Sequence, residues 1–300
     1  MHTPPRPTAA DFDPEALALF DQYVHGGIDR RGFIERAGHI AAASGTTAVA
    51  LLAALSPDFA LGQKVAPGDA RIKTESVEFA SPAGYGKARA YVARPAQASG
   101  PLPVVLVAHE NRGLNPHIED IARRLALDNF IAVAPDALFP LGGYPGTEDA
   151  ARDLFGKLEQ PKTREDFVAA AGYARGIAGN NGRLGAVGFC YGGGIVNLLA
   201  ARVPELVAGV PFYGPGVPPD QAARIKAELV LIFADKDPRI NDGWPAYETA
   251  LKAAGVRFEA FKYPGTEHGF NNDTTPRFDE AAAKQAWGRT LELFNRKLRA

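Results

Sequence analysis

The segment Gly188-Phe189-Cys190-Tyr191-Gly192 decides the fold of this chain. The apolar residues 183–189 that lead into it are typical of a strand, and the Ala-rich residues 192–202 that follow are typical of a helix. Cys190 therefore falls on the turn between them. Small residues two positions before and after a nucleophile permit the sharp bend of a nucleophile elbow. The pattern predicts that Cys190 is a nucleophile and that the backbone amide of Tyr191 donates to an oxyanion.

Two other interpretations of this turn stay open. A lone cysteine among apolar residues is often an inert buried thiol. Glycine-rich turns between a strand and a helix also bind dinucleotides, but these glycines do not follow the G-x-G-x-x-G spacing, and no acidic residue follows about 20 positions later at the end of a second strand. The dinucleotide interpretation is therefore the weaker of the two.

Composition limits the class of protein. A chain of 300 residues with 46% hydrophobic and 22% charged residues is typical of one large globular domain, with or without an appendage. The formal net charge of -1 and the interspersed charges give no basic face for nucleic acid. The single cysteine excludes an intramolecular disulfide, and the histidines lack metal-ligand spacing. We expect no nucleic acid partner, no metal and no cofactor.

Residues 1–62 differ from the rest of the chain. Arg30 and Arg31 are followed by an aromatic and an aliphatic residue, then by the uncharged apolar run 41–55 and by small residues around 60–62. This order resembles a twin-arginine export signal. It predicts that the export machinery recognises Arg30 and Arg31 and that the protein is periplasmic or secreted. The run is too short for a stable membrane span. The alternative is an ordinary amphipathic N-terminal helix in a cytoplasmic protein.

From residue 71 onward, strand and helix patterns alternate. This alternation predicts a single domain over residues 63–300, with a mostly parallel, doubly wound sheet covered by helices on both faces. An antiparallel hairpin is expected at the sheet edge. The expected strands are residues 72–80, 87–94, 103–108, 130–134, 183–189, 206–213, 229–234 and 257–263.

The partners of Cys190 follow from chain order. In α/β-hydrolase triads the nucleophile, the acid and the histidine come in that sequence, each after a strand. His268 is the only histidine after Cys190, so it is the expected base. Asp237 is the preferred acid and Asp235 the second choice, because the acid must reach beyond the strand end. His268 would take the thiol proton while the acid fixes its tautomer.

With these motifs together, the sequence resembles the dienelactone hydrolase (carboxymethylenebutenolidase) family over about residues 72–298. The resemblance implies an α/β-hydrolase fold without a large cap domain, and hydrolysis of a small ester or lactone through a thioester acyl-enzyme. It also implies that Glu110 contacts the resting thiol and keeps it mostly neutral, and that the amide of Asn111 is the second oxyanion donor. The alternative for Glu110 is an ion pair with Arg112. The family's substrate-binding arginine just after the histidine is missing, because the segment reads Gly269-Phe270-Asn271-Asn272-Asp273.

Two other classes of function remain open at this point. An acyltransferase would use the same acyl-enzyme but pass the acyl group to an acceptor other than water. A non-catalytic redox or ligand-binding protein could also be built on a hydrolase fold.

Overall fold

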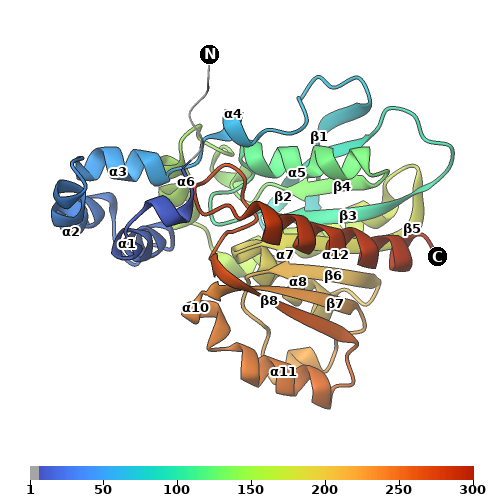
Figure 1. Ribbon diagram of the computed structural model, residues 1–300. Helices are drawn as coiled ribbons and strands as arrows, with labels where there is room; N and C mark the ends of the chain where they lie inside the picture. The colour runs from blue at the N-terminus through green and yellow to red at the C-terminus, as the bar shows by residue number, and fades with distance from the viewer. Residues whose placement is uncertain (1–6) are drawn as a thin grey trace.

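The body of the protein is built on one eight-stranded sheet (Figure 1). The computed structural model describes residues 7–300. The strand order is β1-β2-β4-β3-β5-β6-β7-β8. The β1–β2 and β2–β4 pairs are antiparallel, and every other neighbouring pair is parallel, which confirms the predicted edge hairpin and mostly parallel sheet. The strands are β1 (Ile72–Ser81), β2 (Gly86–Pro95), β3 (Leu102–Ala108), β4 (Ile131–Pro135), β5 (Asn180–Phe189), β6 (Leu206–Phe212), β7 (Glu228–Lys236) and β8 (Phe258–Glu267).

Helices cover both faces of the sheet, as the alternating pattern predicted. Along β3, Val104 and Leu106 join the apolar core on one face, while Val105 and Val107 join the core on the other. The helices α5 (Pro116–Leu127) and α12 (Glu280–Leu298) cover the second of these faces. The first is covered by α6 (Glu148–Phe155), α7 (Gln160–Gly176), α8 (Tyr191–Arg202) and α11 (Trp244–Ala253).

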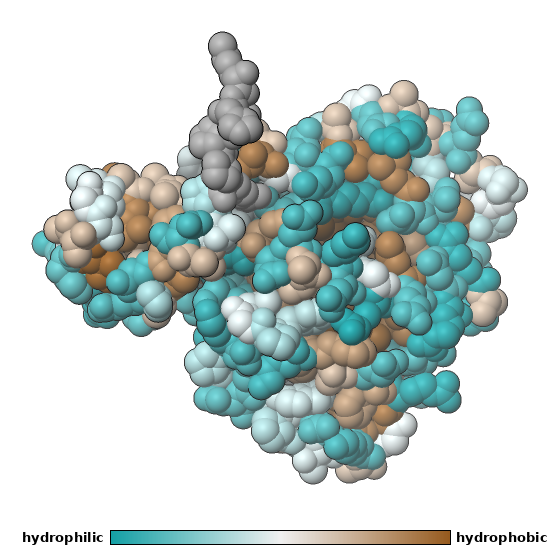
Figure 2. Space-filling view, viewed as in Figure 1, coloured by the Kyte–Doolittle hydropathy of each residue, from teal (hydrophilic) through white to brown (hydrophobic). Residues whose placement is uncertain are grey.

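Residues 9–62 form a helical segment that we call the N-terminal cap. It contains η1 (Ala9–Asp11), α1 (Pro14–Val24), α2 (Arg30–Ala43), α3 (Ala48–Leu55) and α4 (Phe59–Gly62). The side chains of Asp13, Asp29, Thr47 and Asp58 accept hydrogen bonds from the first turns of the four α-helices. The cap has a small apolar core of its own, centred on Phe20, Phe33 and Leu52. The cap extends from one side of the body (Figure 1). Its surface carries apolar residues interspersed with polar ones (Figure 2).

The apolar run 41–55 is not one continuous helix. Helix α2 ends at Ala43, Gly45 adopts a positive φ of 69°, and α3 begins at Ala48. Among residues 7–300, no single helix is long and apolar enough to cross a membrane. The bent pair formed by residues 30–43 and 48–62, with 99° between its halves, passes that test by length and composition. The prediction that residues 1–62 act as an export leader remains a prediction.

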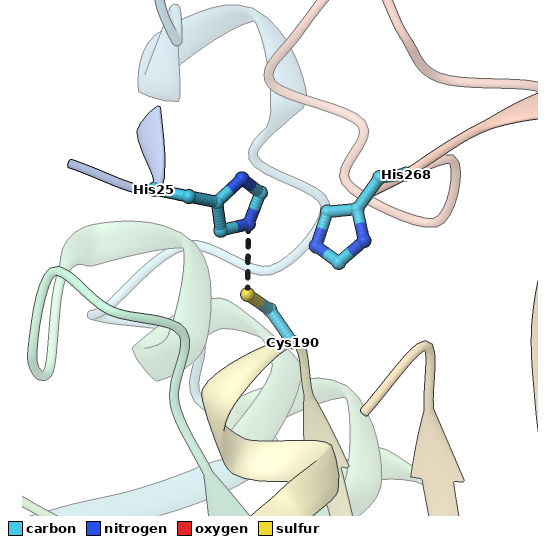
Figure 3. A group of neighbouring side chains, drawn as sticks. All are labelled: His25, Cys190 and His268. Carbon is cyan, nitrogen blue, oxygen red and sulfur yellow. Dashed lines mark hydrogen bonds between the residues drawn. The ribbon is translucent and has the colours of Figure 1, made fainter. Parts of the chain in front are cut away.

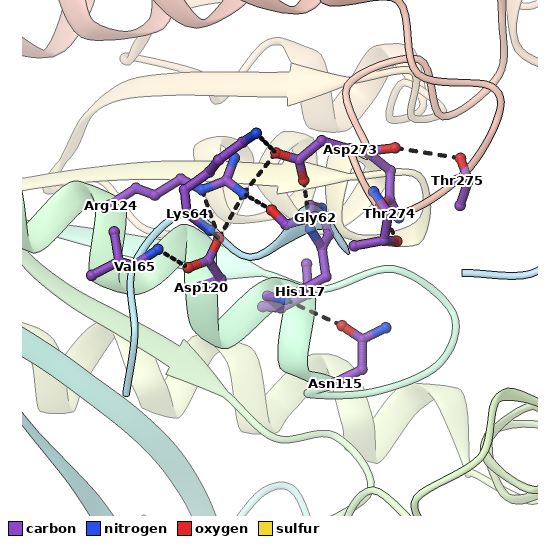
Figure 4. Close-up of polar contacts among 12 residues, drawn as sticks. Gly62, Lys64, Val65, Asn115, His117, Asp120, Arg124, Asp273, Thr274 and Thr275 are labelled. Carbon is purple, nitrogen blue, oxygen red and sulfur yellow. Dashed lines mark hydrogen bonds and ion pairs between the residues drawn. The ribbon is translucent and has the colours of Figure 1, made fainter. Parts of the chain in front are cut away.

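A buried polar network fixes the end of the N-terminal cap to the body (Figure 4). The Asp120 carboxylate on α5 accepts hydrogen bonds from the backbone amides of Lys64, at 3.1 Å, and Val65, at 2.8 Å. Arg124 donates to the carbonyl of Gly62 at 3.1 Å and pairs with Asp273 at 2.8 Å. The chain that follows the cap is therefore tied both to α5 and to the loop after β8.

Candidate active site

Cys190 occupies a strained turn between β5 and α8. Its backbone has φ 55° and ψ −113°, a conformation that a residue with a side chain rarely adopts. A Cβ on Gly188 would lie 2.2 Å from the carbonyl oxygen of Gly192, and a Cβ on Gly192 would lie 2.1 Å from that of Ala108. Both glycines are therefore required for this bend, as the sequence pattern predicted. The geometry is that of a nucleophile elbow.

Gly192→Ala should destabilise the protein by about 3 kcal/mol or more, because the new methyl group would collide with the backbone of β3. Gly172→Ala is the matched control. Gly172 lies inside α7 with no atom within 4 Å of an added Cβ, so this change should stabilise the protein by about 0.5–1 kcal/mol. Urea unfolding of the two variants checks both signs. Equal stability of Gly192→Ala and wild type would contradict the assigned packing of the elbow.

His268 and Asp237 meet at the carboxyl edge of the sheet. Asp237 follows β7 and His268 follows β8, and His268 Nδ1 lies 2.6 Å from Asp237 Oδ2 with both side chains buried. This contact holds the proton on Nδ1 and leaves Nε2 free to act as a base. Asp235 is exposed, and its carboxylate instead accepts a hydrogen bond from the amide of Gly265 at 3.0 Å. The preference for Asp237 over Asp235 therefore agrees with the geometry.

Glu110 and its neighbours lie on the loop after β3. The Glu110 carboxylate accepts a hydrogen bond from Asn272 at 3.0 Å and lines the same pocket as Cys190. Buried His109 donates from Nδ1 to the carbonyl of Glu110 at 2.6 Å and accepts at Nε2 from the amide of Ala137 at 3.2 Å. Burial lowers the pKa of His109, so its ring is neutral. This histidine shapes the loop on which Glu110 lies.

Glu110 was expected to contact the thiol, but among the described residues it does not hydrogen-bond to the sulfur. The hydrogen-bond partner of Cys190 Sγ is Nε2 of His25, at 3.4 Å (Figure 3). The alternative ion pair of Glu110 with Arg112 is not formed either: Arg112 pairs with Glu148 at 3.8 Å and donates to the carbonyls of Val24 and Asn111, each at 3.1 Å.

His25 was not predicted from the sequence, since it lies in the segment interpreted as a leader. It is the C-terminal cap residue of α1, and its only local signal is an aspartate four positions earlier. Its Nδ1 lies 2.8 Å from the carbonyl oxygen of Asp21 and 3.2 Å from the carboxylate of Asp21. A carbonyl only accepts, so Nδ1 carries a proton and Nε2 faces the sulfur.

The surroundings of Cys190 favour its thiolate form. Burial raises the pKa of the thiol, but the neighbouring His268 and His25 outweigh burial and lower the pKa to about 5. The same interactions shift the pKa of His25 in the opposite direction. Burial lowers its pKa, and Cys190 and Asp21 raise it to about 9. This arrangement favours a thiolate over the mostly neutral thiol that the family resemblance implied, because two imidazoles lie near the sulfur and Glu110 does not hydrogen-bond to it; the resting state of Cys190 stays a prediction.

Arg239, on α10 (Pro238–Asn241), lies against both imidazoles. Its Nη2 is 3.0 Å from His25 Nε2 and 3.3 Å from His268 Nδ1. The atoms of His25, Cys190 and His268 that could bind a metal lie within 4.8 Å of one another. A fixed guanidinium charge at this distance opposes a second cation, so we assign no metal to this cluster. The expected absence of metal and cofactor stays a prediction.

The predicted oxyanion donors follow two adjacent strands, β3 and β5. Tyr191 opens α8, where the first amides of a helix have no acceptor within the helix. Asn111 lies on the loop after β3, which pairs with β5, and its side chain donates to the carbonyl of Val24 at 2.8 Å. The backbone of both residues therefore belongs to the edge of the sheet that presents Cys190. Their role as oxyanion donors stays a prediction.

The pocket over Cys190 is walled partly by the N-terminal cap. Its free volume is about 40 Å³, whereas pockets that hold small-molecule ligands measure roughly 300–1,000 Å³. Two arginines that sequence reasoning did not single out as site residues, Arg112 and Arg277, line it. The remaining lining residues come from the cap (Phe20, Tyr23, Val24, Ser56, Pro57) and the body (Glu110, Asn111, Glu148, Asp149, Cys190, His268, Asn272, Thr275).

Comparison with known proteins agrees with this geometry. A family model described as dienelactone hydrolase family matches residues 88–298, and one described as YqhI-like matches residues 4–42. A protein of Escherichia coli (strain K12) described as "Putative carboxymethylenebutenolidase" is 36% identical over 219 residues, which cover 68% of this chain and 81% of that protein. A protein of the same description from Methylorubrum extorquens is 31% identical over 261 residues, covering 80% and 89%.

A crystal structure described as "Putative Dienelactone Hydrolase" from Klebsiella pneumoniae subsp. pneumoniae superposes with a TM-score of 0.64. It is 33% identical and covers 74% of this chain and 98% of its own. The dienelactone hydrolase model covers the part of the chain that carries Cys190, Asp237 and His268. The chain therefore belongs to the dienelactone hydrolase family and has an α/β-hydrolase fold.

Proposed function

We propose that this protein hydrolyses small carboxylic esters or lactones through the triad Cys190, Asp237 and His268. The observation that carries the proposal is the buried thiol on a strained elbow beside a histidine that is paired with a buried carboxylate. A thiol in this setting ionises readily and attacks acyl carbon.

The reaction proceeds in two halves. The Cys190 thiol gives its proton to imidazole, and the sulfur attacks the acyl carbon to form a tetrahedral oxyanion held by the amides of Tyr191 and Asn111. The carbon–oxygen bond then breaks, and the leaving oxygen takes a proton from His268. A water molecule attacks the thioester, gives a proton to His268, and the carbon–sulfur bond breaks to restore the thiolate. Asp237 keeps the His268 tautomer fixed throughout.

Arginines near the thiol favour an acyl part with an acidic group. The Nε atoms of Arg112 and Arg277 are buried without a hydrogen-bond partner among the described residues. Buried guanidinium N–H groups bind carboxylates well, often through two hydrogen bonds. The guanidinium of Arg112 lies 3.8 Å from the Glu148 carboxylate and that of Arg277 lies 3.5 Å from the Asp21 carboxylate, so both charges are already paired, and the two Nε–H groups are what these side chains offer to a substrate carboxylate.

A turnover screen tests the proposed function. Enol-lactones, aryl esters and thioesters, each as a pair with and without a carboxylate on the acyl part, would be incubated with wild type and with Cys190→Ala. Turnover by wild type, together with a covalent acyl mass on Cys190 in the intact protein, is the expected result. Product formed equally by both proteins, or no turnover of any class, would overturn the proposal.

Export through the twin-arginine pathway remains our proposal for localisation. It is supported by Arg30 and Arg31 followed by the apolar run 41–55. Changing both arginines to lysine should leave the protein inside the cell, because the pathway reads the paired guanidinium groups. Cell fractionation with intact-mass measurement checks this. Full-length wild-type protein in the cytoplasm would contradict export, and the mass would also show whether His25 is retained after any cut near residues 60–62.

A further inference from the structure

Two imidazoles, each backed by an aspartate, flank the one thiol of this chain. His268 is backed by Asp237, as family membership leads one to expect. His25 comes from the N-terminal cap and is backed by Asp21. The two rings stand edge to face with centroids 4.7 Å apart, on the same side of Cys190 (Figure 3).

We propose that His25 is a second proton acceptor for Cys190, delivered by the N-terminal cap, and that it holds the thiol ionised while the cap covers the site. In this step the S–H bond breaks, its electron pair stays on sulfur, and the proton moves to Nε2 of His25. The proton on Nδ1 of His25 stays there, donated to the carbonyl oxygen of Asp21. The inference rests on the proposed function in that both make Cys190 the nucleophile.

The charges around His25 support this assignment. On its own segment it faces Asp21, and it caps the C-terminal end of α1, where the exposed carbonyls of a helix end stabilise a cation. From the body it faces Cys190, His268 and Arg239. The Arg239 guanidinium lies 3.0 Å from His25 Nε2 and 3.3 Å from His268 Nδ1, so it opposes a proton on either ring, and the attraction of Cys190 and Asp21 for protonated His25 must outweigh it. The cluster holds one mobile proton that either ring accepts from sulfur.

The contacts around Asp21 leave its carboxylate charged. Arg277 lies 3.5 Å from it, in addition to His25. Burial raises the pKa of Asp21, but the hydrogen bond from His25 and the nearby charges of His25, His268 and Arg277 outweigh burial and lower it below its usual range. An ionised Asp21 is what a protonated His25 requires.

The N-terminal cap is placed to open and close over this cluster. Its apolar core is separate from the cores of the body. Its contacts with the body include polar ones, which join Tyr23 and Arg30 to Asp149 and the Val24 carbonyl to Asn111 and Arg112, and a ring contact between Phe59 and Tyr144. Interfaces of this kind, between units with separate cores, permit relative motion. About 40 Å³ is less room than small-molecule pockets have, so a cap that is retained in the working enzyme would move away from the pocket when an ester binds.

This arrangement gives the cap a chemical role as well as a covering one. In the closed state Cys190 is only 6% exposed, its sulfur is hydrogen-bonded to His25, and the nearest ring nitrogen of His268 lies within 4.8 Å. When the cap opens, the proton is left to the Cys190–His268 pair, which carries out hydrolysis.

The test is the pH titration of Cys190 in the full-length protein. Because the chain has one cysteine, the ultraviolet absorbance of its thiolate, corrected with Cys190→Ala, reports this residue alone. His25→Gln keeps size and hydrogen bonding but cannot take a proton. We expect its thiolate midpoint to rise by about 1–3 pH units, which is the effect of losing one opposite charge at this distance. Below that midpoint, the rate of iodoacetamide labelling should fall about tenfold for each pH unit by which the midpoint rises.

His39→Gln is the matched control, because His39 lies on α2 of the same cap with 69% of its side chain exposed. Its titration should match that of wild type. Asp21→Asn is a second variant that keeps His25 and weakens its proton affinity, so a smaller rise of the thiolate midpoint is expected. Circular dichroism and thermal unfolding show whether each variant is folded.

A purely covering role for His25 gives a different result. If His25→Gln loosens the cap without changing proton affinity, labelling becomes faster at every pH and the midpoint stays where it is in wild type. That outcome, or an unchanged titration in both His25→Gln and Asp21→Asn, would overturn the proposal. Neither measurement needs ester turnover, so failure of the proposed hydrolase function and failure of the His25 inference are distinguishable.

Discussion

Cys190→Ala is expected to lower kcat for ester hydrolysis by about 10⁶-fold, and His268→Ala by a similar factor. Removing the thiol removes the acyl-enzyme route, because no other described nucleophile sits on the elbow at the end of β5. Removing the imidazole of His268 takes away both the proton donor for the leaving oxygen and the base for the attacking water. Steady-state assays on the best substrate from the screen measure both losses.

The double variant provides the control for this prediction. Residues of one triad act as a unit, so Cys190→Ala combined with His268→Ala should be about as inactive as either single variant. Losses that multiply would show that the two side chains act independently. A Cys190→Ala protein with turnover near that of wild type would show that the reaction takes place elsewhere.

The elbow was predictable from the sequence because its signal is local. Gly188 and Gly192 leave room for a bend that a Cβ at either position would block. Both glycines lie within the five consecutive residues 188–192, so the pattern can be recognised from the sequence alone. The strands were predictable for a similar reason. In β3 alternate apolar residues serve opposite cores, so the strand reads as an unbroken apolar run.

His25 could not be predicted from the sequence because nothing near it marks its role. It lies 165 residues from Cys190, and the contact depends on how the N-terminal cap packs on the body. Arg30 illustrates the same point, since in the structure it pairs with Asp149 at 2.6 Å, which a twin-arginine motif does not suggest. The capping residues Asp13, Asp29 and Thr47 were the available sign that this segment forms ordinary folded helices.

The Glu110 hypothesis failed in its detail for a physical reason. The loop after β3 places Glu110 in the wall of the pocket, as predicted from the end of its strand. Its carboxylate accepts a hydrogen bond from Asn272 and not from the thiol. The space beside the sulfur is filled by His25 instead. A carboxylate there would oppose ionisation of the thiol, whereas an imidazole favours it. The geometry therefore favours a thiolate where the family resemblance implied a neutral thiol, and the titration of His25→Gln tests this difference.

Asp237→Asn is expected to lower kcat by about 10⁴-fold while leaving the fold intact. The Asp237 carboxylate accepts the Nδ1 proton of His268 at 2.6 Å in a buried site. An amide NH₂ at that position would donate to Nδ1, which moves the ring proton to Nε2 and removes the base that faces the substrate. Asp235→Asn is the matched control two residues away. Because Asp235 is exposed and accepts from the Gly265 amide, its loss should change kcat by less than about threefold.

The two aspartate variants should also differ in how the loss divides between kcat and KM. The partner of His268 acts on proton transfer and not on substrate contact, so Asp237→Asn should lower kcat and kcat/KM together with little change in KM. Raising the pH should not restore the kcat of Asp237→Asn, because the activity is lost through the wrong tautomer of His268 and not through its charge. If Asp235→Asn proved the more damaging change, the acid of the triad would have to be reassigned to the exposed carboxylate, and the buried contact between Asp237 and His268 would have only a structural role.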